Sequence, residues 1–308
     1  MIQIAIHHPL WYSQGMLISM IVPCYNEEEA LPHFMARFES VAPLLGGAQV
    51  ELLLVNDGSR DGTLALITRY ATQDSRVRVL SFSRNFGKEA ALLCGLMHAQ
   101  GDMVCVLDAD LQDPPELLPG MLDMLRETGC DCVATRRATR AGEPPVRSFF
   151  ARTFYRMINS VSVVRVVDGA RDFRLMRREM VDAILRLSER RRFSKGLFAW
   201  VGFDVRYIDY ENVERVAGTT KWSFWALTRY ALEGIISLTD APLFLPFALG
   251  TLCFIACAIL LLCASWPAAL LCSLAGLSLA CIGILGLYLA RILEETRKRP
   301  LYVLRKGP

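Results

Sequence analysis

The sequence lacks the features that mark secreted, fibrous or disordered proteins. Its ten cysteines include no C-x-x-C pair, so a disulfide framework is not indicated and we expect reduced thiols. Residues 1–15 have neither a basic start nor a long apolar stretch, and we expect a leader there instead of a signal peptide. With 53% hydrophobic and 21% charged residues, the chain is neither collagen-like nor disordered. Its length allows a large buried core.

Two common nucleotide-binding motifs are also missing. No G-x-x-x-x-G-K-[ST] motif occurs, since Gly87-Lys88 lacks the rest of it, and no G-x-G-x-x-G follows the first apolar run. The chain therefore fits neither a P-loop hydrolase nor a dinucleotide-binding enzyme. A formal net charge of +3 is too small to predict a nucleic-acid-binding surface, and we expect no nucleic-acid partner.

Charge itself is missing from residues 242–290, which contain no Asp, Glu, Lys or Arg. A helix needs about 20 apolar residues to cross a bilayer, so this stretch fits two spans, at 243–265 and 268–290. Two helices in a soluble core are the alternative, but such helices rarely run this long without a charge. Residues 291–308 carry six basic and two acidic side chains, which marks the cytoplasmic side. Because two spans return the chain to its starting side, we also expect the N-terminal part to be cytoplasmic.

Strand-like and helix-like segments alternate through the N-terminal part. Short apolar runs typical of strands cover 17–22, 50–55, 77–82, 103–107 and 132–135. Apolar residues at helical spacing cover 27–43, 63–72, 88–99 and 115–128. This alternation predicts an α/β fold with a mostly parallel sheet that is covered on both faces.

Polar side chains follow each of the five expected strands. They occupy 25–27, 56–59, 83–85, 108–113 and 136–137. Any one of these clusters alone is typical of an ordinary turn. The carboxyl ends of parallel strands lie at one edge of a sheet, and ligands bind at that edge. The five clusters together therefore predict a single binding crevice.

Asp108 and Asp110 form a D-x-D pair directly after the fourth apolar run. Hard oxygen ligands of this kind, with Gln112 or Asp113 beside them, suit Mg²⁺ or Mn²⁺. A divalent ion with few protein ligands usually shares its coordination shell with substrate phosphates. We therefore expect a nucleotide diphosphate as substrate, with the metal stabilising the leaving diphosphate. Asp57 is suited to hydrogen bonding with the base or the ribose.

Basic residues continue beyond the fifth run. Six arginines lie between residues 136 and 156, where they either form a solvated helix face or bind a second phosphate. Residues 189–200 mix basic and aromatic side chains, which predicts a helix at the membrane surface. Arg215 and Lys221 flank a Gly-Thr-Thr loop that is suited to clamp a diphosphate. Residues 223–239 predict an amphipathic helix that leads into the membrane.

Several longer stretches form a specific set when they are taken together. They are IVPCYNEE at 21–28, VNDGS at 55–59, SRNFGKEAAL at 83–92, DADLQDPPE at 108–116, DFRLM at 172–176, residues 189–203, the Lys221-Trp222 loop and YLARILEETRKRPLYVLR at 288–305. With this set the chain resembles the membrane-anchored polyprenyl-phosphate glycosyltransferases of glycosyltransferase family two. The resemblance is strongest to the GtrB-like bactoprenol glucosyltransferases, which are related to dolichol-phosphate mannose synthases. It covers residues 16–305.

The resemblance implies an architecture and an activity. After the leader at 1–15, it implies a Rossmann-like, nucleotide-sugar-binding GT-A domain at 16–222, an amphipathic helix at 223–241, a transmembrane hairpin at 242–290 and a basic tail at 291–308. The implied reaction transfers glucose from UDP-glucose to undecaprenyl phosphate, for modification of lipopolysaccharide or another cell-envelope glycan. The enzyme would be an inverting, metal-dependent hexosyltransferase of the bacterial cytoplasmic membrane. It would also be able to form homo-oligomers through its membrane helices.

The resemblance also assigns roles to residues of the matching motifs. The nucleotide sugar would be held by Pro23, Tyr25, Glu27, Asp57, Asp108, Arg215 and Lys221. The metal would be bound by Asp108, Asp110 and Gln112, and the lipid phosphate by Arg136, Arg147 and Arg174. Asp110 and Asp172 would be catalytic, with Asp172 in the place of the family's proposed base. A phosphate monoester is already largely dianionic at neutral pH, so we expect Asp172 to orient Arg174 or the acceptor phosphate instead.

Three alternatives remain at this stage. A processive polysaccharide synthase would carry a Q-x-x-R-W motif and a multi-helix channel, and neither is indicated. A non-catalytic, membrane-anchored protein that binds nucleotide sugars would not need Asp108, Asp110 and Asp172 intact. A different donor sugar, such as N-acetylglucosamine, mannose or one of the aminoarabinose type, is left open because the sequence gives no physical basis for the choice.

Overall fold

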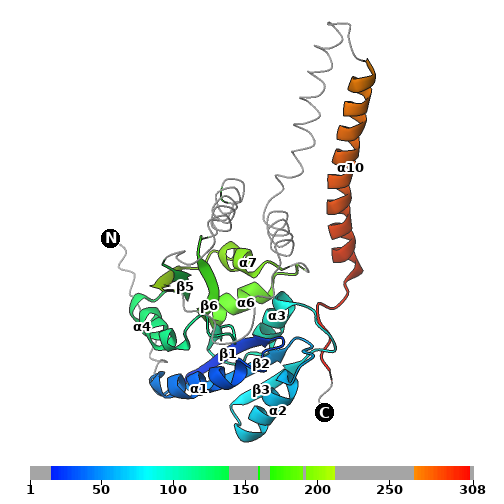
Figure 1. The fold of residues 1–308 in the computed structure, drawn as a ribbon. Helices are drawn as coiled ribbons and strands as arrows, with labels where there is room; N and C mark the ends of the chain where they lie inside the picture. The colour runs from blue at the N-terminus through cyan, green and yellow to red at the C-terminus, as the bar shows by residue number, and fades with distance from the viewer. Residues whose placement is uncertain (1–14, 139–158, 160–166, 190–191, 212–266, 306–308) are drawn as a thin grey trace, which may run out of the picture.

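Seven strands form one sheet in the part of the chain that the structure describes (Figure 1). The structure is a computed structural model and describes residues 15–138, 159, 167–189, 192–211 and 267–305. The strands are β1 (Leu17–Cys24), β2 (Gln49–Asn56), β3 (Val77–Ser81), β4 (Met103–Val106), β5 (Cys132–Arg137), β6 (Ala170–Arg177) and β7 (Val205–Tyr210). Their order across the sheet is β3-β2-β1-β4-β6-β5-β7.

All of these strands except β6 run in one direction. β1 pairs in parallel with β2 and β4, β2 with β3, and β5 with β7, whereas β6 is antiparallel to both β4 and β5. The start of β6 therefore lies at the edge where the other strands end. This single reversal brings Asp172, near the start of β6, to the same edge as Asp108, which follows β4.

Helices cover both faces of the sheet. The helices α1 (Leu31–Val41), α2 (Thr63–Gln73) and α4 (Leu118–Thr128) pack in one apolar cluster, and α3 (Lys88–His98), α6 (Arg178–Leu185) and α7 (Ser194–Trp200) pack in a second. Alternate residues of one strand enter the two clusters, as Met20 and Ile21 of β1 do. A short 3-10 turn at Ala42–Leu44 follows α1, and another at Pro115–Leu117 precedes α4. The predicted α/β fold with a mostly parallel, doubly covered sheet is confirmed.

The five expected strands and the four expected helices are all present, with small differences at their ends. The first helix begins at Leu31 instead of residue 27, because the preceding residues form a turn. Strands β6 and β7 were not expected from the sequence. Charged residues interrupt the apolar pattern of both, and β6 contains three arginines in eight residues. The expectation of reduced thiols holds for six cysteines, which are free: Cys24, Cys94, Cys105, Cys130, Cys132 and Cys281.

The expected surface helix at 189–200 is shorter and more buried than predicted. The helix α7 begins at Ser194, and its Leu197 and Phe198 are buried in the core. Trp200 at its end is 57% exposed. Thus the apolar face of α7 serves packing within the domain, and the prediction that this segment lies on a membrane surface is wrong for Leu197 and Phe198.

One long helix, α10 (Pro267–Arg297), projects away from the domain (Figure 1). Its segment Gly276–Arg297 is long and apolar enough to cross a bilayer, and no residue counts as buried in the apolar 18-residue window of this segment. The helix contains the expected span at 268–290 and extends past it, so the expected tail begins as helix. It ends where Lys298 adopts a positive φ of 47° and Pro300 follows. The expected first span at 243–265 and the amphipathic helix at 223–241 lie outside the described residues.

The last described residues return from α10 to the edge strand β3. Leu304 forms an antiparallel bridge with Phe82, and the backbone N–H of Arg305 donates to the carbonyl of Ser81 at 2.7 Å. The ring of Tyr302 stacks on Phe82 with 4.9 Å between ring centroids. Residues 302–305 of the basic tail are therefore part of the domain surface.

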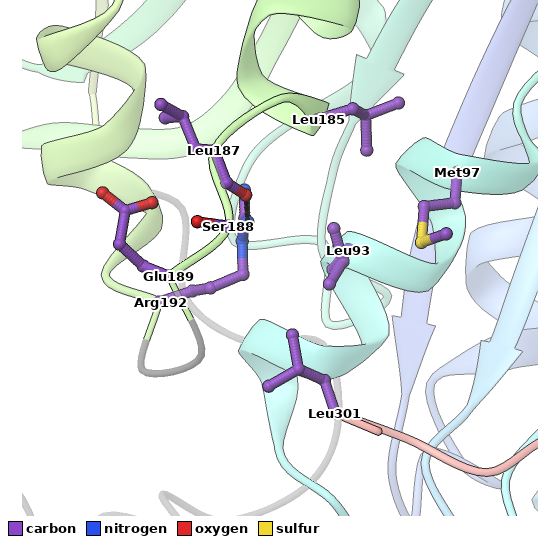
Figure 2. A pocket seen from close by; sticks show the side chains of 8 residues that line it. All are labelled: Leu93, Met97, Leu185, Leu187, Ser188, Glu189, Arg192 and Leu301. Atoms are coloured by element: carbon purple, nitrogen blue, oxygen red, sulfur yellow. Dashed lines mark hydrogen bonds between the residues drawn. The ribbon is translucent and has the colours of Figure 1, made fainter. Parts of the chain in front are cut away.

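A pocket of about 320 Å³ lies beside this returning segment (Figure 2). It is lined by Leu93, Met97, Leu185, Leu187, Ser188, Glu189, Arg192 and Leu301. The side chains come from α3, from the end of α6 and the loop after it, and from the C-terminal segment. None of the residues predicted to bind substrate or metal lines this pocket.

Candidate active site

One lysine lies between two carboxylates at the carboxyl edge of the sheet. The Nζ of Lys88, the first residue of α3, is 2.8 Å from the carboxylate of Asp108 and 2.6 Å from Oδ2 of Asp172. Asp108 follows β4, and Asp172 lies near the start of β6. The three side chains are between 18% and 35% exposed. The group is thus assembled from three separate elements and is open to a ligand.

Opposite charges decide the protonation of this group. Burial lowers the pKa of Lys88, but the charges of Asp108 and Asp172 outweigh it and raise the pKa above the usual value. Burial raises the pKa of Asp172, but Lys88, Lys195 and Arg174 hold it well below its usual range. At neutral pH Lys88 is therefore a cation and Asp172 an anion.

A buried ion pair fixes the loop that follows Asp108. Arg171 donates from Nε to Oδ1 of Asp113 at 2.8 Å and from Nη2 to Oε1 of Gln112 at 3.2 Å. The hydroxyl of Tyr210, at the end of β7, donates to the same oxygen of Asp113. Between these anchors and the strand, Leu111 adopts a positive φ of 57°, which is uncommon for a residue with a side chain. The loop conformation is therefore imposed by its neighbours.

Asp108 and Asp110 are the residues that could hold a divalent ion. Oδ1 of Asp110 accepts the backbone N–H of Gln112 at 3.1 Å, and the side-chain oxygen of Gln112 already accepts from Arg171. The described residues contain no group of three or more His, Cys, Asp or Glu side chains that could hold a metal. Two carboxylates that rely on substrate phosphates to complete the shell do fit Mg²⁺ or Mn²⁺. The ammonium of Lys88 beside Asp108 shows that this position attracts a cation.

Three residues predicted to bind the nucleotide lie together at the end of β1. Pro23, Tyr25 and Glu27 are each partly exposed there. The loop is tied to the one after β2, because the backbone N–H of Asn26 donates to the hydroxyl of Ser59 at 3.0 Å. The structure thus brings these predicted residues to one edge of the crevice, and their contact with a nucleotide stays a prediction.

Asp57 has a structural role in the described fold. It is 3% exposed, and its carboxylate accepts the backbone N–H of Phe86 at 2.6 Å and of Gly87 at 3.0 Å. Burial raises the pKa of Asp57, against the lowering effect of these two bonds. The next residue, Gly58, has a φ of +62°, and a Cβ on it would lie 2.3 Å from the carbonyl carbon of Arg84. Asp57 and Gly58 therefore shape the loop that leads into α3.

The residues predicted to bind phosphate are only partly covered by the structure. Arg136 forms a two-pronged ion pair with Asp209 on the adjacent β7, at 2.6 and 2.8 Å. This pair uses Nε and Nη2 of Arg136, and a role for Arg136 on a lipid phosphate stays a prediction. Arg147, Arg215 and Lys221 lie outside the described residues.

Arg174 is buried behind the site. It is 4% exposed, donates to the carbonyls of Arg171 at 2.9 Å and Asp172 at 3.3 Å, and lies 3.7 Å from the centre of the Phe198 ring. The guanidinium thus holds the backbone of Asp172, while the Asp172 side chain turns to Lys88. This differs from one of the two roles expected for the Asp172 side chain, orienting Arg174; the other role, orienting the acceptor phosphate, stays a prediction. A role for Arg174 on a lipid phosphate stays a prediction.

The start of α7 is fastened to α3 by a carboxylate. Glu89 accepts the backbone N–H of Ser194 at 3.1 Å and also its hydroxyl proton. Burial raises the pKa of Glu89 to about 7. The next residue, Lys195, donates from Nζ to the carbonyl of Ala170 at 3.0 Å. Two neighbouring residues of α3 are therefore part of this arrangement: Lys88 contacts Asp108 and Asp172, and Glu89 holds the start of α7.

Sequence reasoning assigned no role to several residues of this site. They are Lys88, Glu89, Arg171, Ser194 and Lys195. Lys88 and Glu89 lie within a stretch already singled out by the resemblance, directly after the third polar cluster. That position was the available signal. Ser194 and Lys195 lie within another stretch of that set, residues 189–203. Arg171 had no such signal, because it meets Asp113 only when distant segments of the chain come together.

Comparison with known proteins shows that the chain is similar to sugar-transferring enzymes. The profile of Glycosyl transferase family 2 matches residues 19–185. The SfII prophage-derived bactoprenol glucosyl transferase of Shigella flexneri is 38% identical, over 95% of this chain and 98% of its own length. The prophage bactoprenol glucosyl transferase homolog of Escherichia coli is 37% identical, over 94% of this chain and 99% of its own.

Solved structures show the same fold at lower similarity. The glucosyl-3-phosphoglycerate synthase of Mycobacterium tuberculosis, in a complex with Mn²⁺, UDP-glucose and phosphoglyceric acid, has a TM-score of 0.51 and 20% identity. That match covers 72% of this chain and 78% of the other. The mannosyl-3-phosphoglycerate synthase of Rubrobacter xylanophilus has a TM-score of 0.50 and 19% identity, over 71% of this chain and 72% of the other.

Proposed function

The chain belongs to glycosyl transferase family 2, and from that premise we propose that it transfers glucose from UDP-glucose to undecaprenyl phosphate. The observation that carries the proposal is the cationic Lys88 between Asp108 and Asp172 at the carboxyl edge of the sheet. In this group, Asp108 would serve the metal-bound diphosphate together with Asp110, and Lys88 beside Asp172 would offer positive charge to a second phosphate. The names of near full-length relatives supply the bactoprenol acceptor and the glucose.

The chemistry asked of these residues is a displacement between two anionic substrates. An oxygen of the acceptor phosphate attacks the anomeric carbon of the sugar, the bond to the diphosphate breaks, and UDP leaves with the electron pair. A single displacement of this kind inverts the anomeric centre. Asp108 and Asp110 would hold Mg²⁺ or Mn²⁺, which supplies charge neutralisation to the leaving diphosphate when bound. The M. tuberculosis enzyme of the same fold was solved with Mn²⁺ and UDP-glucose, which supports this assignment.

Asp172 would position groups on the acceptor side of the crevice. The acceptor phosphate has a second pKa near ~6 and needs little deprotonation at neutral pH. Asp172 is itself held as an anion by Lys88, Lys195 and Arg174, which makes it a weak base. We therefore assign it the alignment of Lys88 with the incoming phosphate, a contribution of proximity and orientation.

The path of the chain supports a membrane hairpin with a cytoplasmic domain. Residues 302–305 contact β3 and its flank, so the chain after α10 lies on the side of the domain. If α10 crosses a bilayer, residues 212–266 must cross it an odd number of times. The uncharged run at 242–265 provides one such crossing. The basic end of α10 favours the cytoplasmic side for the domain, where UDP-sugars are made available to the crevice.

A panel of donors tests the proposed reaction. Purified full-length protein in detergent would be given undecaprenyl phosphate, Mg²⁺ or Mn²⁺, and in turn UDP-glucose, UDP-N-acetylglucosamine, GDP-mannose and a UDP-aminoarabinose. Of these four donors, we expect only UDP-glucose to give release of the nucleotide and a glycosylated lipid. Transfer of another sugar would replace glucose in the proposal. Binding of a donor without any release of nucleotide would support the non-catalytic alternative.

The matched control for this panel is the double variant Asp108→Asn with Asp110→Asn. Both changes keep the size of the side chains and remove the negative charges that would bind a metal. We expect product formation to fall by at least about 100-fold, with an unchanged thermal unfolding temperature. Full activity of this variant, or of the wild type in chelator, would contradict the metal role.

A further inference from the structure

We propose that Lys88 binds the phosphate of the acceptor, and that Asp108 releases Lys88 for this purpose when a divalent cation binds the D-x-D pair. The inference rests on the proposed function and adds a binding residue to it. It starts from the contacts of one ammonium, 2.8 Å from Asp108 and 2.6 Å from Asp172. One of these carboxylates belongs to the candidate metal site and the other to the acceptor side.

The backbone around Lys88 is clamped, so the lysine side chain is the part that can change partner. On one side, Asp57 accepts the N–H groups of Phe86 and Gly87. On the other side, Glu89 is bonded to Ser194 at the start of α7. The long side chain of lysine carries its three donors on a flexible four-carbon stem. The Nζ atom can therefore move between carboxylates while α3 stays in place.

Charge gives the direction of this movement. A divalent cation on Asp108 and Asp110 would stand close to the position that the ammonium now occupies, and like charges repel. Lys88 would then keep only Asp172 as its partner. Asp172 is a single negative charge that feels three positive side chains, Lys88, Lys195 and Arg174. Glu89, which interacts with both Asp172 and Lys88, offsets part of this positive charge. The remaining excess suits a phosphate monoester, which carries about −1.5 to −2 at pH 7.

A structural lysine would give a different response to substitution. If Lys88 served only to neutralise buried carboxylates, its loss would destabilise the fold and weaken the binding of both substrates to the same degree. In the proposed role, the loss of Lys88 frees Asp108 for the metal and weakens the binding of the acceptor only. Metal affinity and acceptor affinity should then change in opposite directions, which a purely structural role would not produce.

Metal binding without substrates tests the first half of the proposal. Full-length Lys88→Met would be titrated with Mn²⁺ alone and followed by electron paramagnetic resonance. We expect Mn²⁺ to bind at least about tenfold more tightly than to the wild type, because a competing cation is gone. Lys88→Arg keeps the charge and should bind Mn²⁺ within about twofold of the wild type. The matched control is Lys195→Met, which removes a neighbouring lysine with no bond to Asp108 and should leave Mn²⁺ affinity within about twofold.

Steady-state kinetics test the second half. With Lys88→Met we expect the KM for undecaprenyl phosphate to rise at least about tenfold while the KM for the nucleotide sugar stays within about threefold, and Lys88→Arg should restore most of the acceptor KM. If Lys88→Met does not fold, as judged by circular dichroism, Lys88→Gln replaces it. Unchanged Mn²⁺ affinity, or an unchanged acceptor KM, would overturn the proposal. A wild-type enzyme that glucosylates no lipid phosphate would instead overturn the proposed function, and the Mn²⁺ titration separates the two failures.

Discussion

At the scale of single residues, the site depends on pairs whose members are far apart in the chain. Lys88 meets Asp172 across 84 positions, and Arg171 meets Asp113 across 58. Each pair joins a residue of β6 to a distant part of the chain, α3 for Lys88 and the loop after β4 for Asp113. The chemistry of the individual residues is readable from the sequence, since carboxylates after a strand indicate a cation site. The sequence does not show that Lys88 is the cation beside these carboxylates, because Lys88 belongs to α3, whereas Asp108 follows β4 and Asp172 belongs to β6.

Replacing Asp172 by Asn separates orientation from proton abstraction. We expect kcat to fall by about 10- to 100-fold, because Lys88 loses the partner that aims it, while the shape of the pH profile is kept. The shape should persist because the titrating group is the acceptor phosphate, with a pKa near ~6. The measurement is kcat between about pH 5.5 and 9 for both proteins, with saturating substrates. Loss of one titrating limb in the variant would identify Asp172 as the base.

At the scale of elements, the reversed strand β6 and the start of α3 hold the crevice together. β6 brings Asp172, Arg171 and Arg174 to the edge where β4 delivers Asp108. The first turn of α3 supplies Lys88 to the crevice and Glu89 to α7. The alternation of apolar runs and helices predicted that the sheet is mostly parallel, and the structure supplies the order of its strands. The place of β6 was not predicted, because its apolar pattern is broken by arginines whose partners lie on other strands.

The buried pair of Arg171 and Asp113 should contribute strongly to the stability of the D-x-D loop. Asp113 is 1% exposed, so Arg171→Met would leave a buried carboxylate with only Tyr210 as donor. We expect a loss of about 3 kcal/mol in the free energy of unfolding. Arg206→Met is the matched control, because its pair with Asp204 is more than half exposed on both sides and should cost below ~1 kcal/mol. Equal losses in urea unfolding of the two variants would contradict a special role for the buried pair.

The contact between α3 and α7 should depend on pH through Glu89. Its carboxyl has a pKa raised to about 7 by burial, with Asp172 adding to the shift and Ser194 and Lys88 opposing it. A raised pKa means that the folded protein binds the proton of Glu89 more tightly than the unfolded chain does. This proton therefore contributes to the free energy of unfolding at low pH. This contribution is lost as the pH rises from about 5 to about 7 and is constant above that.

The variant Glu89→Gln removes this titration and keeps a hydrogen-bonding side chain. We expect the wild type to lose about 1–2 kcal/mol relative to Glu89→Gln between pH ~5 and ~7.5, or a few degrees in unfolding temperature. Differential scanning of both proteins over this range provides the measurement. Parallel curves for the two proteins would show that Glu89 titrates as an ordinary exposed carboxyl.

At the scale of the whole molecule, the C-terminal segment after α10 returns to the domain, so this end of α10 lies next to it. The helix projects from the domain (Figure 1), and exposed apolar side chains such as Leu271, Ile282 and Leu289 cover it. The segment after it closes back on β3 through Leu304 and Tyr302. In the proposed function, this return would hold the crevice near a lipid-borne acceptor if α10 crosses the bilayer.

Both chain ends should therefore be found on the cytoplasmic side of the membrane. We expect epitope tags placed before Met1 and after Pro308 to be cleaved by protease in inverted membrane vesicles and to be protected in intact spheroplasts. The return of the chain to β3 and the basic end of α10 are the physical reasons. A periplasmic loop marker at residue 266 provides the matched control, because the proposed hairpin places it on the opposite side. Tags found on opposite sides would contradict an even number of spans.

The sequence by itself determined the alternation of strands and helices, the edge at which the polar clusters meet, the D-x-D pair and the uncharged run before a basic end. These features are local, because apolar spacing, turn chemistry and hydrophobicity act over a few neighbouring residues. Only the tertiary structure decided that Lys88 joins Asp108 to Asp172, that Asp57 and Arg136 are held by partners in the fold, and that the basic tail returns to β3. Such pairings depend on the order and direction of strands that lie far apart in the chain, above all on the reversal of β6 between β4 and β5.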